Sequence, residues 1–195
     1  MDVSVLLEPK IDLERLAEVL DGLGHEGRVH ATRTWHKKRQ SAIFEACKGR
    51  TLDLDFLVPP SIGELVEVIH DGKNTLPMFT HFQKRFVRLP AGEEHKVGGY
   101  NEQSLSVFSG PGFFVCKNGD GEHEGEIAID YTHVPKHKPD SWPGIRDNEG
   151  GLAGVVYGGM VDYLRRVSNN VSIGHAWKNG KPIDAWFTLV RKDVS

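Results

Sequence analysis

Cysteine is scarce in this sequence: Cys47 and Cys116 are the only two among 195 residues, and both lie in apolar surroundings. Two cysteines cannot build a disulfide framework, and such thiols are typical of buried side chains in a reducing compartment. No apolar run approaches the ~18 residues of a membrane span. The N-terminal stretch from Met1 to Glu8 also lacks the basic and apolar regions of a signal peptide. We therefore expect a cytoplasmic protein with no membrane span.

The motifs of nucleotide binding and of common covalent catalysis are also missing. The chain contains no Walker A motif, no G-x-G-x-x-G segment opening a helix, no G-x-S-x-G elbow and no C-x-x-C pair. Its net charge of −3 gives no general attraction to nucleic acid. Basic residues between Arg28 and Arg39, and a second basic set of Lys84, Arg85 and Arg88, have aromatic residues among them and bring nucleic acid into consideration. Because the chain is acidic overall and has no recognisable nucleic-acid module, we interpret these residues as a solvated face and expect neither nucleic acid nor a cofactor.

What the sequence does contain is the composition of an ordinary globular protein. Hydrophobic residues make up 38% of the chain and charged residues 26%, which is usual for soluble domains. A length of 195 residues fits one domain spanning 1–195, large enough to bury a sizeable core.

Hydrophobic periodicity predicts both helices and strands. Residues 12–23 place apolar side chains on one helical face, with Asp12 available as the N-cap. Asn179-Gly180, between two apolar stretches, is typical of a two-residue hairpin turn. Residues 61–69 begin with a capping box and are assigned a short helix, although they also fit one arm of a hairpin turned at residues 71–74. The expected helices are 12–23, 37–47, 61–69 and 151–167, and the expected strands are 28–36, 52–56, 104–109, 112–117, 125–133, 171–178 and 183–190.

These elements predict an α+β fold: a strongly curved antiparallel sheet, or a lipocalin-like barrel, with two to four helices. A strongly curved sheet tends to close into a barrel that can hold one small ligand. The expected helix 151–167 carries glycines at positions 150, 154 and 158 along one seam, each costing about 1 kcal/mol relative to alanine. We therefore expect another backbone or a ligand to approach this helix closely.

Asp130 heads the candidate polar sites because it interrupts the apolar stretch Ile127–Tyr131. A buried carboxylate requires an arginine or several backbone donors. Arg146 and Arg165 are the candidate partners, since arginine can bind a carboxylate through two hydrogen bonds. Three roles stay open: a structural ion pair that joins helix to sheet, a polar anchor for a ligand at a pocket mouth, and a general acid or base.

Histidines near the same stretch raise the question of a metal site. His123, His133 and His137, with His175 further along the chain and together with Asp130, are residue types that bind zinc or iron. Their spacing matches no compact metal-binding template, and 10 histidines spread along one chain produce such groupings by chance. We interpret them as solvated or hydrogen-bonded side chains and expect no metal, while heme stays open.

Short segments in the second half of the chain resemble small bacterial lipocalin-like proteins of the GXWXG type. The resemblance covers about the last 110 residues and implies a lipocalin-like barrel that binds apolar ligands. The naming W-x-G element is absent, and Met78-Phe79-Thr80-His81 stands where it would be sought. The segments that carry the resemblance are Phe82–Phe86, Gly99–Asn101, Ile129–Tyr131, Ile145–Asp147, Arg165–Val167, Ile173-Gly174 and Trp186-Phe187.

Together these observations favour a cytoplasmic barrel that binds an apolar small molecule such as a fatty acid or an isoprenoid. Arg146 or Arg165 would meet an acidic head group, with Asp130 and Tyr131 nearby, because ligand pockets are mostly apolar with a few convergent polar groups. One alternative is an isomerase, cyclase or hydrolase that uses Asp130 or His133 as general base beside Tyr131. Another is an interaction protein without a ligand, and a homodimer stays open. The expected lining residues are Phe108, Phe114, Ile129, Tyr131, Trp177, Trp186 and Phe187.

Overall fold

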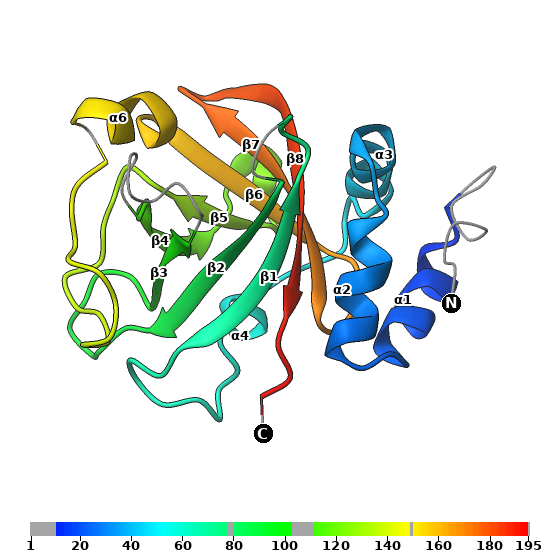
Figure 1. Ribbon diagram of the computed structural model, residues 1–195, viewed down its shortest axis with the longest axis horizontal. Coiled ribbons are helices and arrows are strands. Elements are labelled where there is room, and N and C mark those ends of the chain that lie inside the picture. The colour runs from blue at the N-terminus through cyan, green and yellow to red at the C-terminus, as the bar shows by residue number, and fades with distance from the viewer. Residues whose placement is uncertain (1–10, 78–79, 103–110, 149, 195) are drawn as a thin grey trace.

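In the computed structural model of this chain, the strands form a closed antiparallel barrel (Figure 1). The structure describes residues 11–77, 80–102, 111–148 and 150–194. The barrel strands of this described part are β1 (Val68–Asn74), β2 (His81–Arg88), β3 (Val97–Glu102), β4 (Phe113–Asn118), β5 (Ile127–Asp130), β6 (Met160–Arg166), β7 (Val171–Lys178) and β8 (Lys181–Arg191). Each strand pairs with the next along the chain, and β1 pairs with β8 to close the ring. The expected curved antiparallel sheet is therefore confirmed, in its closed form.

Alternation along each strand separates an inner wall from an outer face. On β2, Phe82, Lys84 and Phe86 are buried at every second position. The register places the inner residues of neighbouring strands opposite one another, as Lys84 lies opposite Asn101 of β3. Because side chains in a strand point alternately to the two faces, every second residue of a strand faces the barrel interior.

Three phenylalanine rings of the inner wall lie flat over glycines of neighbouring strands. Phe82 pairs with Gly72, Phe114 with Gly99 and Phe187 with Gly174 in the strand registers. A methyl group added to any of these glycines would lie within 2.7 Å of the opposing ring. Because glycine has no side chain, each ring has room to lie against the wall. Such aromatic–glycine pairs help to fix the strand register.

Three helices cover one outer side of the barrel, next to β1, β7 and β8 (Figure 1). They are α1 (Leu13–Asp21), α2 (His25–Arg33) and α3 (Lys37–Ala46), and Asp12 caps the first by accepting a hydrogen bond from the Arg15 backbone. The expected helices 12–23 and 37–47 are confirmed. The expected strand 28–36 is wrong, because the residues buried in α2 are Arg28, Val29, Ala31 and Thr32, which recur at helical spacing.

A single helical turn closes one end of the barrel. This turn, α4 (Leu54–Leu57), begins where the Asp53 side chain accepts a hydrogen bond from the Phe56 backbone N–H. Phe56 and Leu57 pack into the core that fills the barrel. The expected strand 52–56 is therefore wrong: capping by Asp53 overrides the alternation of leucines and aspartates.

The expected long helix 151–167 is also wrong. A short helix, α6 (Gly151–Tyr157), ends at Gly158, and strand β6 follows from Met160. Gly159 has a φ of +67°, a backbone conformation that favours glycine and breaks the helix. The glycines thus end a helix instead of lining one, and Asp162 and Leu164 become inward-facing residues of a strand.

Of the remaining expected elements, some are confirmed and one is wrong. Residues 61–69 form no helix in the structure, since β1 begins at Val68 and pairs with β2 as a hairpin whose connection lies beyond residues 71–74. Strands at 112–117, 125–133, 171–178 and 183–190 are confirmed within a few residues. Asn179 and Gly180 both have positive φ, as the expected two-residue turn requires. The expected strand 104–109 lies outside the described residues. A short 3₁₀ turn, η2 (Gly121–His123), precedes β5.

None of the helices in the described ranges is long and apolar enough to cross a membrane.

Candidate functional site

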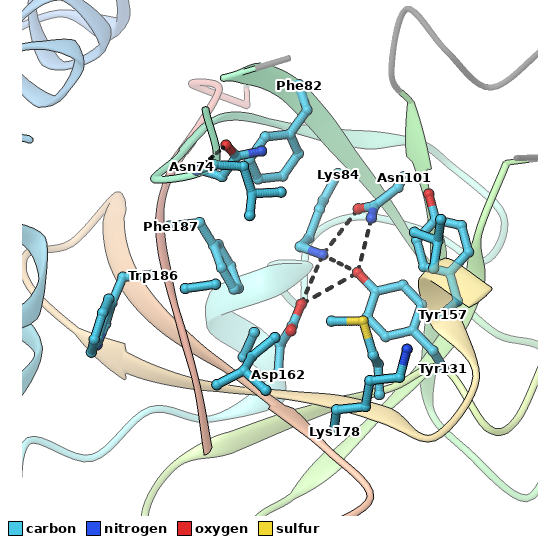
Figure 2. A pocket seen from close by; sticks show the side chains of 16 residues that line it. Asn74, Phe82, Lys84, Asn101, Tyr131, Tyr157, Asp162, Lys178, Trp186 and Phe187 are labelled. Atoms are coloured by element: carbon cyan, nitrogen blue, oxygen red, sulfur yellow. Dashed lines mark hydrogen bonds and ion pairs between the residues drawn. The ribbon is translucent and has the colours of Figure 1, made fainter. Parts of the chain in front are cut away.

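A cavity of about 270 Å³ occupies the end of the barrel opposite α4. Its walls are mostly apolar, and residues of α6 contribute to its mouth. Phe82 and Phe187, two of the rings held by glycine, lie on the wall (Figure 2). The lining residues are Asn74, Leu76, Phe82, Lys84, Asn101, Tyr131, Val156, Tyr157, Met160, Asp162, Ala176, Lys178, Ile183, Ala185, Trp186 and Phe187.

Four buried polar side chains, from β2, β3, β6 and the residue that follows β5, meet at the base of this cavity (Figure 2). Lys84 Nζ donates hydrogen bonds to Asn101 Oδ1 at 2.9 Å, to Asp162 Oδ2 at 3.2 Å and to the Tyr131 hydroxyl oxygen. Tyr131 accepts a second hydrogen bond from Asn101 Nδ2 at 3.0 Å and donates one to Asp162 Oδ2 at 3.3 Å. We call Lys84, Asn101, Tyr131 and Asp162 the basal cluster.

The Lys84 ammonium is enclosed by aromatic rings. Its Nζ lies 5.7 Å from the ring centroid of Phe82, 5.2 Å from Phe114, 4.9 Å from Tyr131 and 5.0 Å from Phe187. Such rings attract a cation through their negative faces, and the attraction grows when water is excluded. Three of these four rings are the ones held against glycines, so the same register that pins the strands also encloses the lysine.

Burial acts on both ionised groups of the basal cluster. It lowers the pKa of Lys84 and raises the pKa of Asp162, although the attraction between the two partly opposes each shift. Burial, together with the nearby Asp162 charge, also raises the pKa of Tyr131 well above its ordinary value. The charged lysine–carboxylate pair and its neutral form, in which the proton has moved to Asp162, are thus closer in energy here than in water.

The Asp162 carboxylate is only partly satisfied. Its Oδ2 accepts hydrogen bonds from both Lys84 and Tyr131, whereas its buried Oδ1 has no hydrogen-bond partner among the described residues. A buried carboxylate oxygen without a partner costs free energy, and buried polar atoms nearly always have one. Among the cavity-lining side chains, Asp162 therefore has an acceptor oxygen that no described residue satisfies.

The mouth of the cavity combines an aromatic contact with exposed apolar side chains. Tyr157, at the end of α6, stacks on Tyr131 with ring centroids 5.2 Å apart. Lys178 Nζ donates to the backbone carbonyl oxygen of Val155 at 2.7 Å and so ties α6 to β7. Leu76, Val155 and Val156 are 50%, 70% and 42% exposed, which leaves an apolar rim around the entrance.

Asp130, the leading candidate from the sequence, lies away from this cavity. It alternates with the inward residues Ile129 and Tyr131, and its carboxylate accepts hydrogen bonds from Lys117 Nζ at 2.8 Å and from the Thr132 backbone at 2.9 Å. Burial alone would raise its pKa, but these hydrogen bonds outweigh it and lower the pKa. His133 Nδ1 lies 3.2 Å from the same carboxylate.

The two candidate arginines also lie apart from the cavity and from Asp130. Arg165 Nε donates to Glu126 at 2.7 Å, and its guanidinium lies 3.8 Å from the ring centroid of Phe44 in α3. Arg146 is exposed in the loop before α6. The structure therefore pairs Asp130 with Lys117 where an arginine was expected, and it brings neither arginine to the pocket.

The expected aromatic lining is reproduced in part. Tyr131, Trp186 and Phe187 line the cavity, and Phe114 stands behind it against Tyr131 at 5.3 Å. Ile129 belongs to the packed core of the barrel. Trp177 instead packs with Tyr163 and His123 in a separate aromatic group. Phe108 lies outside the described residues.

Lys84 and Asn101 are the functional candidates that sequence reasoning missed. The sequence assigned Lys84 to a solvated basic set because neighbouring Arg85 and Arg88 are also basic. A signal was nevertheless present: Lys84 stands between Phe82 and Phe86 at a spacing of two residues, so in a strand it shares their buried face.

The histidines considered as metal ligands each bond elsewhere. His123 Nδ1 lies 2.9 Å from Glu126, His137 Nδ1 lies 2.8 Å from Glu93, and His175 Nε2 lies 2.8 Å from the Ile183 carbonyl oxygen. Among the residues that the structure describes, no group of three or more histidine, cysteine, aspartate or glutamate side chains is arranged to hold a metal ion.

The fold and this site define a class of protein: a closed antiparallel barrel with a ligand-sized, mostly apolar cavity at one end. Comparisons of the chain with protein-family models, with curated proteins and with solved structures found no match.

Proposed function

We propose that this protein binds one small, mainly apolar molecule in the barrel cavity, in the manner of a lipocalin-like carrier. The observation that carries the proposal is the combination of apolar walls with a buried Asp162 oxygen that has no partner among the described residues. Ligand sites commonly have this form, with a few polar groups that orient a ligand held by apolar contacts.

The basal cluster favours a neutral head group on the ligand. The charges of Lys84 and Asp162 neutralise each other. The Lys84 ammonium already donates hydrogen bonds to Asn101, Tyr131 and Asp162. A fatty-acid carboxylate would meet Asp162 at the cavity base and add a buried negative charge without a cation of its own. A hydroxyl, an arylamine N–H or an amide N–H would instead satisfy Asp162 Oδ1, so we propose a neutral ligand with one hydrogen-bond donor.

The rim of the cavity supports entry from this end. Leu76, Val155 and Val156 expose apolar surface beside the opening, while α4 fills the other end of the barrel. An apolar molecule arriving at this rim would move from one apolar surface to another on its way to the basal cluster.

Two related fluorescent probes test the preference for a neutral ligand. N-phenyl-1-naphthylamine is neutral and has one N–H donor, and 1-anilinonaphthalene-8-sulfonate adds a sulfonate to the same framework. We expect the neutral probe to bind with one site per chain and at least about tenfold more tightly, because one buried unpaired charge costs more than 1.4 kcal/mol. Equal affinity, or binding of the sulfonate alone, would contradict the proposed head group. Native mass spectrometry of freshly purified protein provides a second measurement, as a retained ligand would appear as added mass.

A matched pair of aspartate variants tests the polar anchor. Asp162→Asn keeps the shape of the side chain but replaces one acceptor oxygen with a donor, so we expect about ten- to hundredfold weaker binding of N-phenyl-1-naphthylamine, from the ~1.5–3 kcal/mol of a lost hydrogen bond to a charged group. Asp130→Asn alters an equally buried carboxylate outside the cavity and should leave the affinity unchanged. Loss of binding in both variants, or in neither, would remove Asp162 from the proposed role.

The enzyme alternative based on Asp130 or His133 receives no support from the geometry. Asp130 is enclosed by Lys117 and Thr132. A catalytic base should open onto the cavity, and Asp130 does not line it.

A further inference from the structure

Lys84 supplies the primary amine of the basal cluster at the cavity. Among the described lining residues, Lys84 and Lys178 carry amines, and Lys178 lies at the mouth, bonded to the Val155 carbonyl oxygen. Lys84 is 2% exposed, whereas Lys178 is partly exposed. A lysine buried in an apolar pocket is the usual setting for amine chemistry with carbonyl compounds.

We propose that Lys84 forms a Schiff base with an apolar aldehyde or ketone bound in the barrel. This inference rests on the proposed function, since the carbonyl compound must first occupy the cavity. It extends that function from neutral ligands with a donor to neutral carbonyl compounds, which have no donor of their own, and it adds one covalent step.

Asp162 lies where the step needs a proton carrier. Its Oδ2 is 3.2 Å from Lys84 Nζ, close enough to take a proton directly from the ammonium. Burial lowers the pKa of Lys84 and raises that of Asp162, so both shifts favour this transfer over the same transfer in water. Lys84 then has the free lone pair that nucleophilic attack requires.

The reaction balances without an oxidant, a reductant or a further reactant. The Lys84 nitrogen attacks the carbonyl carbon, a C–N bond forms, and the carbonyl π electrons move to oxygen, which accepts a proton lost by nitrogen. Asp162 then returns its proton to the resulting hydroxyl group, which leaves as water while the nitrogen lone pair forms the C=N bond. One ammonium and one carbonyl thus give one iminium and one water, with the Asp162 carboxylate beside the iminium as its counterion.

The surroundings of Lys84 also fit the product. An iminium is a cation on the same nitrogen, so the rings of Phe82, Phe114, Tyr131 and Phe187 enclose it as they enclose the ammonium. The iminium N–H retains Asp162 as a hydrogen-bond acceptor, and Asn101 and Tyr131 are released to contact the bound molecule. Apolar walls limit the access of water that would hydrolyse the C=N bond.

Reductive trapping tests the covalent step in the full-length protein. The protein is incubated at pH 7 with sodium cyanoborohydride and either trans-cinnamaldehyde or octanal, and the adducts are located by peptide mass spectrometry. We expect one main adduct, on Lys84, formed at least about tenfold faster than at any other lysine, because the cavity holds the bound aldehyde beside this amine and so raises its effective concentration there. N-phenyl-1-naphthylamine should slow this labelling by competing for the cavity.

Two variants serve as controls. Lys38→Met removes an exposed lysine of α3 and should leave the labelling rate unchanged. The double variant Lys84→Met/Asp162→Leu replaces the buried ion pair with apolar side chains, a change that folded proteins often tolerate, and should lose the main adduct while keeping its circular dichroism spectrum.

Separate binding measurements distinguish failure of this step from failure of the proposed function. Cinnamyl alcohol and octanol have the same chains as the aldehydes but cannot form an imine. If they displace N-phenyl-1-naphthylamine while neither aldehyde labels Lys84 in preference to other lysines, the Schiff base is overturned and the binding proposal stands. If neither the alcohols nor the probe binds and no preferred adduct forms, both proposals fall.

Discussion

Two buried ion pairs among the described residues, one on each side of the barrel wall, differ in how fully their carboxylates are hydrogen-bonded. Arg165–Glu126 lies outside the barrel beneath α3, and Lys84–Asp162 lies inside it at the base of a cavity. Both Glu126 oxygens are paired, Oε1 with Arg165 and Oε2 with His123, whereas only one Asp162 oxygen has a partner among the described residues. All four side chains are buried, so the feature that distinguishes the inner pair is a carboxylate that lines a cavity and has one oxygen without a partner among the described residues.

Removing the arginine of the outer pair should have the largest effect on stability. Arg165→Met leaves Glu126 buried without its main cation and removes the stacking on Phe44, so we expect the free energy of unfolding to fall by about 3–5 kcal/mol. Urea denaturation measures this loss. The affinity of the folded variant for N-phenyl-1-naphthylamine should stay within about twofold of the original. A large change in affinity would show that the outer pair also acts on the cavity.

His70 extends the comparison to a buried group that is kept neutral at the closed end of the barrel. Burial lowers its pKa from 6.5 to about 3, against the opposing hydrogen bond between Nε2 and the Leu57 carbonyl oxygen at 3.0 Å. Because the folded pKa lies below the unfolded one, His70 stabilises the fold above pH 6.5, and this contribution is lost as pH falls from 6.5 toward 3.

Replacing His70 measures that loss directly. We expect His70→Gln to reduce the fall in unfolding free energy between pH 6.5 and 3 by on the order of 3 kcal/mol, since each pKa unit corresponds to about 1.4 kcal/mol and local relaxation relieves part of the cost. Urea denaturation across this pH range is the measurement. His36→Gln, which changes an exposed histidine, is the matched control and should reproduce the original curve. Identical curves for all three proteins would refute the argument.

A substitution in one of the glycine–phenylalanine pairs should have a smaller effect on stability, and it acts beside the inner ion pair, Lys84–Asp162. A methyl group at Gly174 would lie 2.2 Å from Phe187, so Gly174→Ala must displace this ring from the wall and from Lys84. We expect a loss of about 2 kcal/mol in unfolding free energy from overpacking, together with weaker binding of N-phenyl-1-naphthylamine. Gly144→Ala adds the same methyl group where nothing lies within 4 Å and should change neither quantity. Unchanged binding in Gly174→Ala would show that the position of Phe187 does not matter to the site.

Local signals in the sequence were sufficient for much of the fold. The Asp12 cap, the leucines of α1 and the Asn179-Gly180 turn all act within a few residues, so their structures followed from short patterns. Prediction failed where local and distant interactions compete. The hydrophobic pattern of residues 160–166 fits a helix as well as a strand. Only pairing with β5 and β7 selects the strand.

The candidate site was predictable in part for the same reason. Tyr131, Trp186 and Phe187 were expected at a pocket because aromatic residues on late strands line barrels, and they do line it. Lys84 was missed because its charge suggests solvent. Its alternation with Phe82 and Phe86 indicates a shared buried face only once the segment is known to be a strand.

The sequence by itself determined that the chain would form a curved antiparallel sheet with helices at its N-terminal end, because hydrophobic period, caps and turn residues act locally. Only the tertiary structure decided which charges became a site. Lys84, Asn101, Tyr131 and Asp162 are far apart in the chain, and the barrel register alone brings them together at one depth. Strand pairing sets that register over the whole ring, so no short segment of sequence contains it.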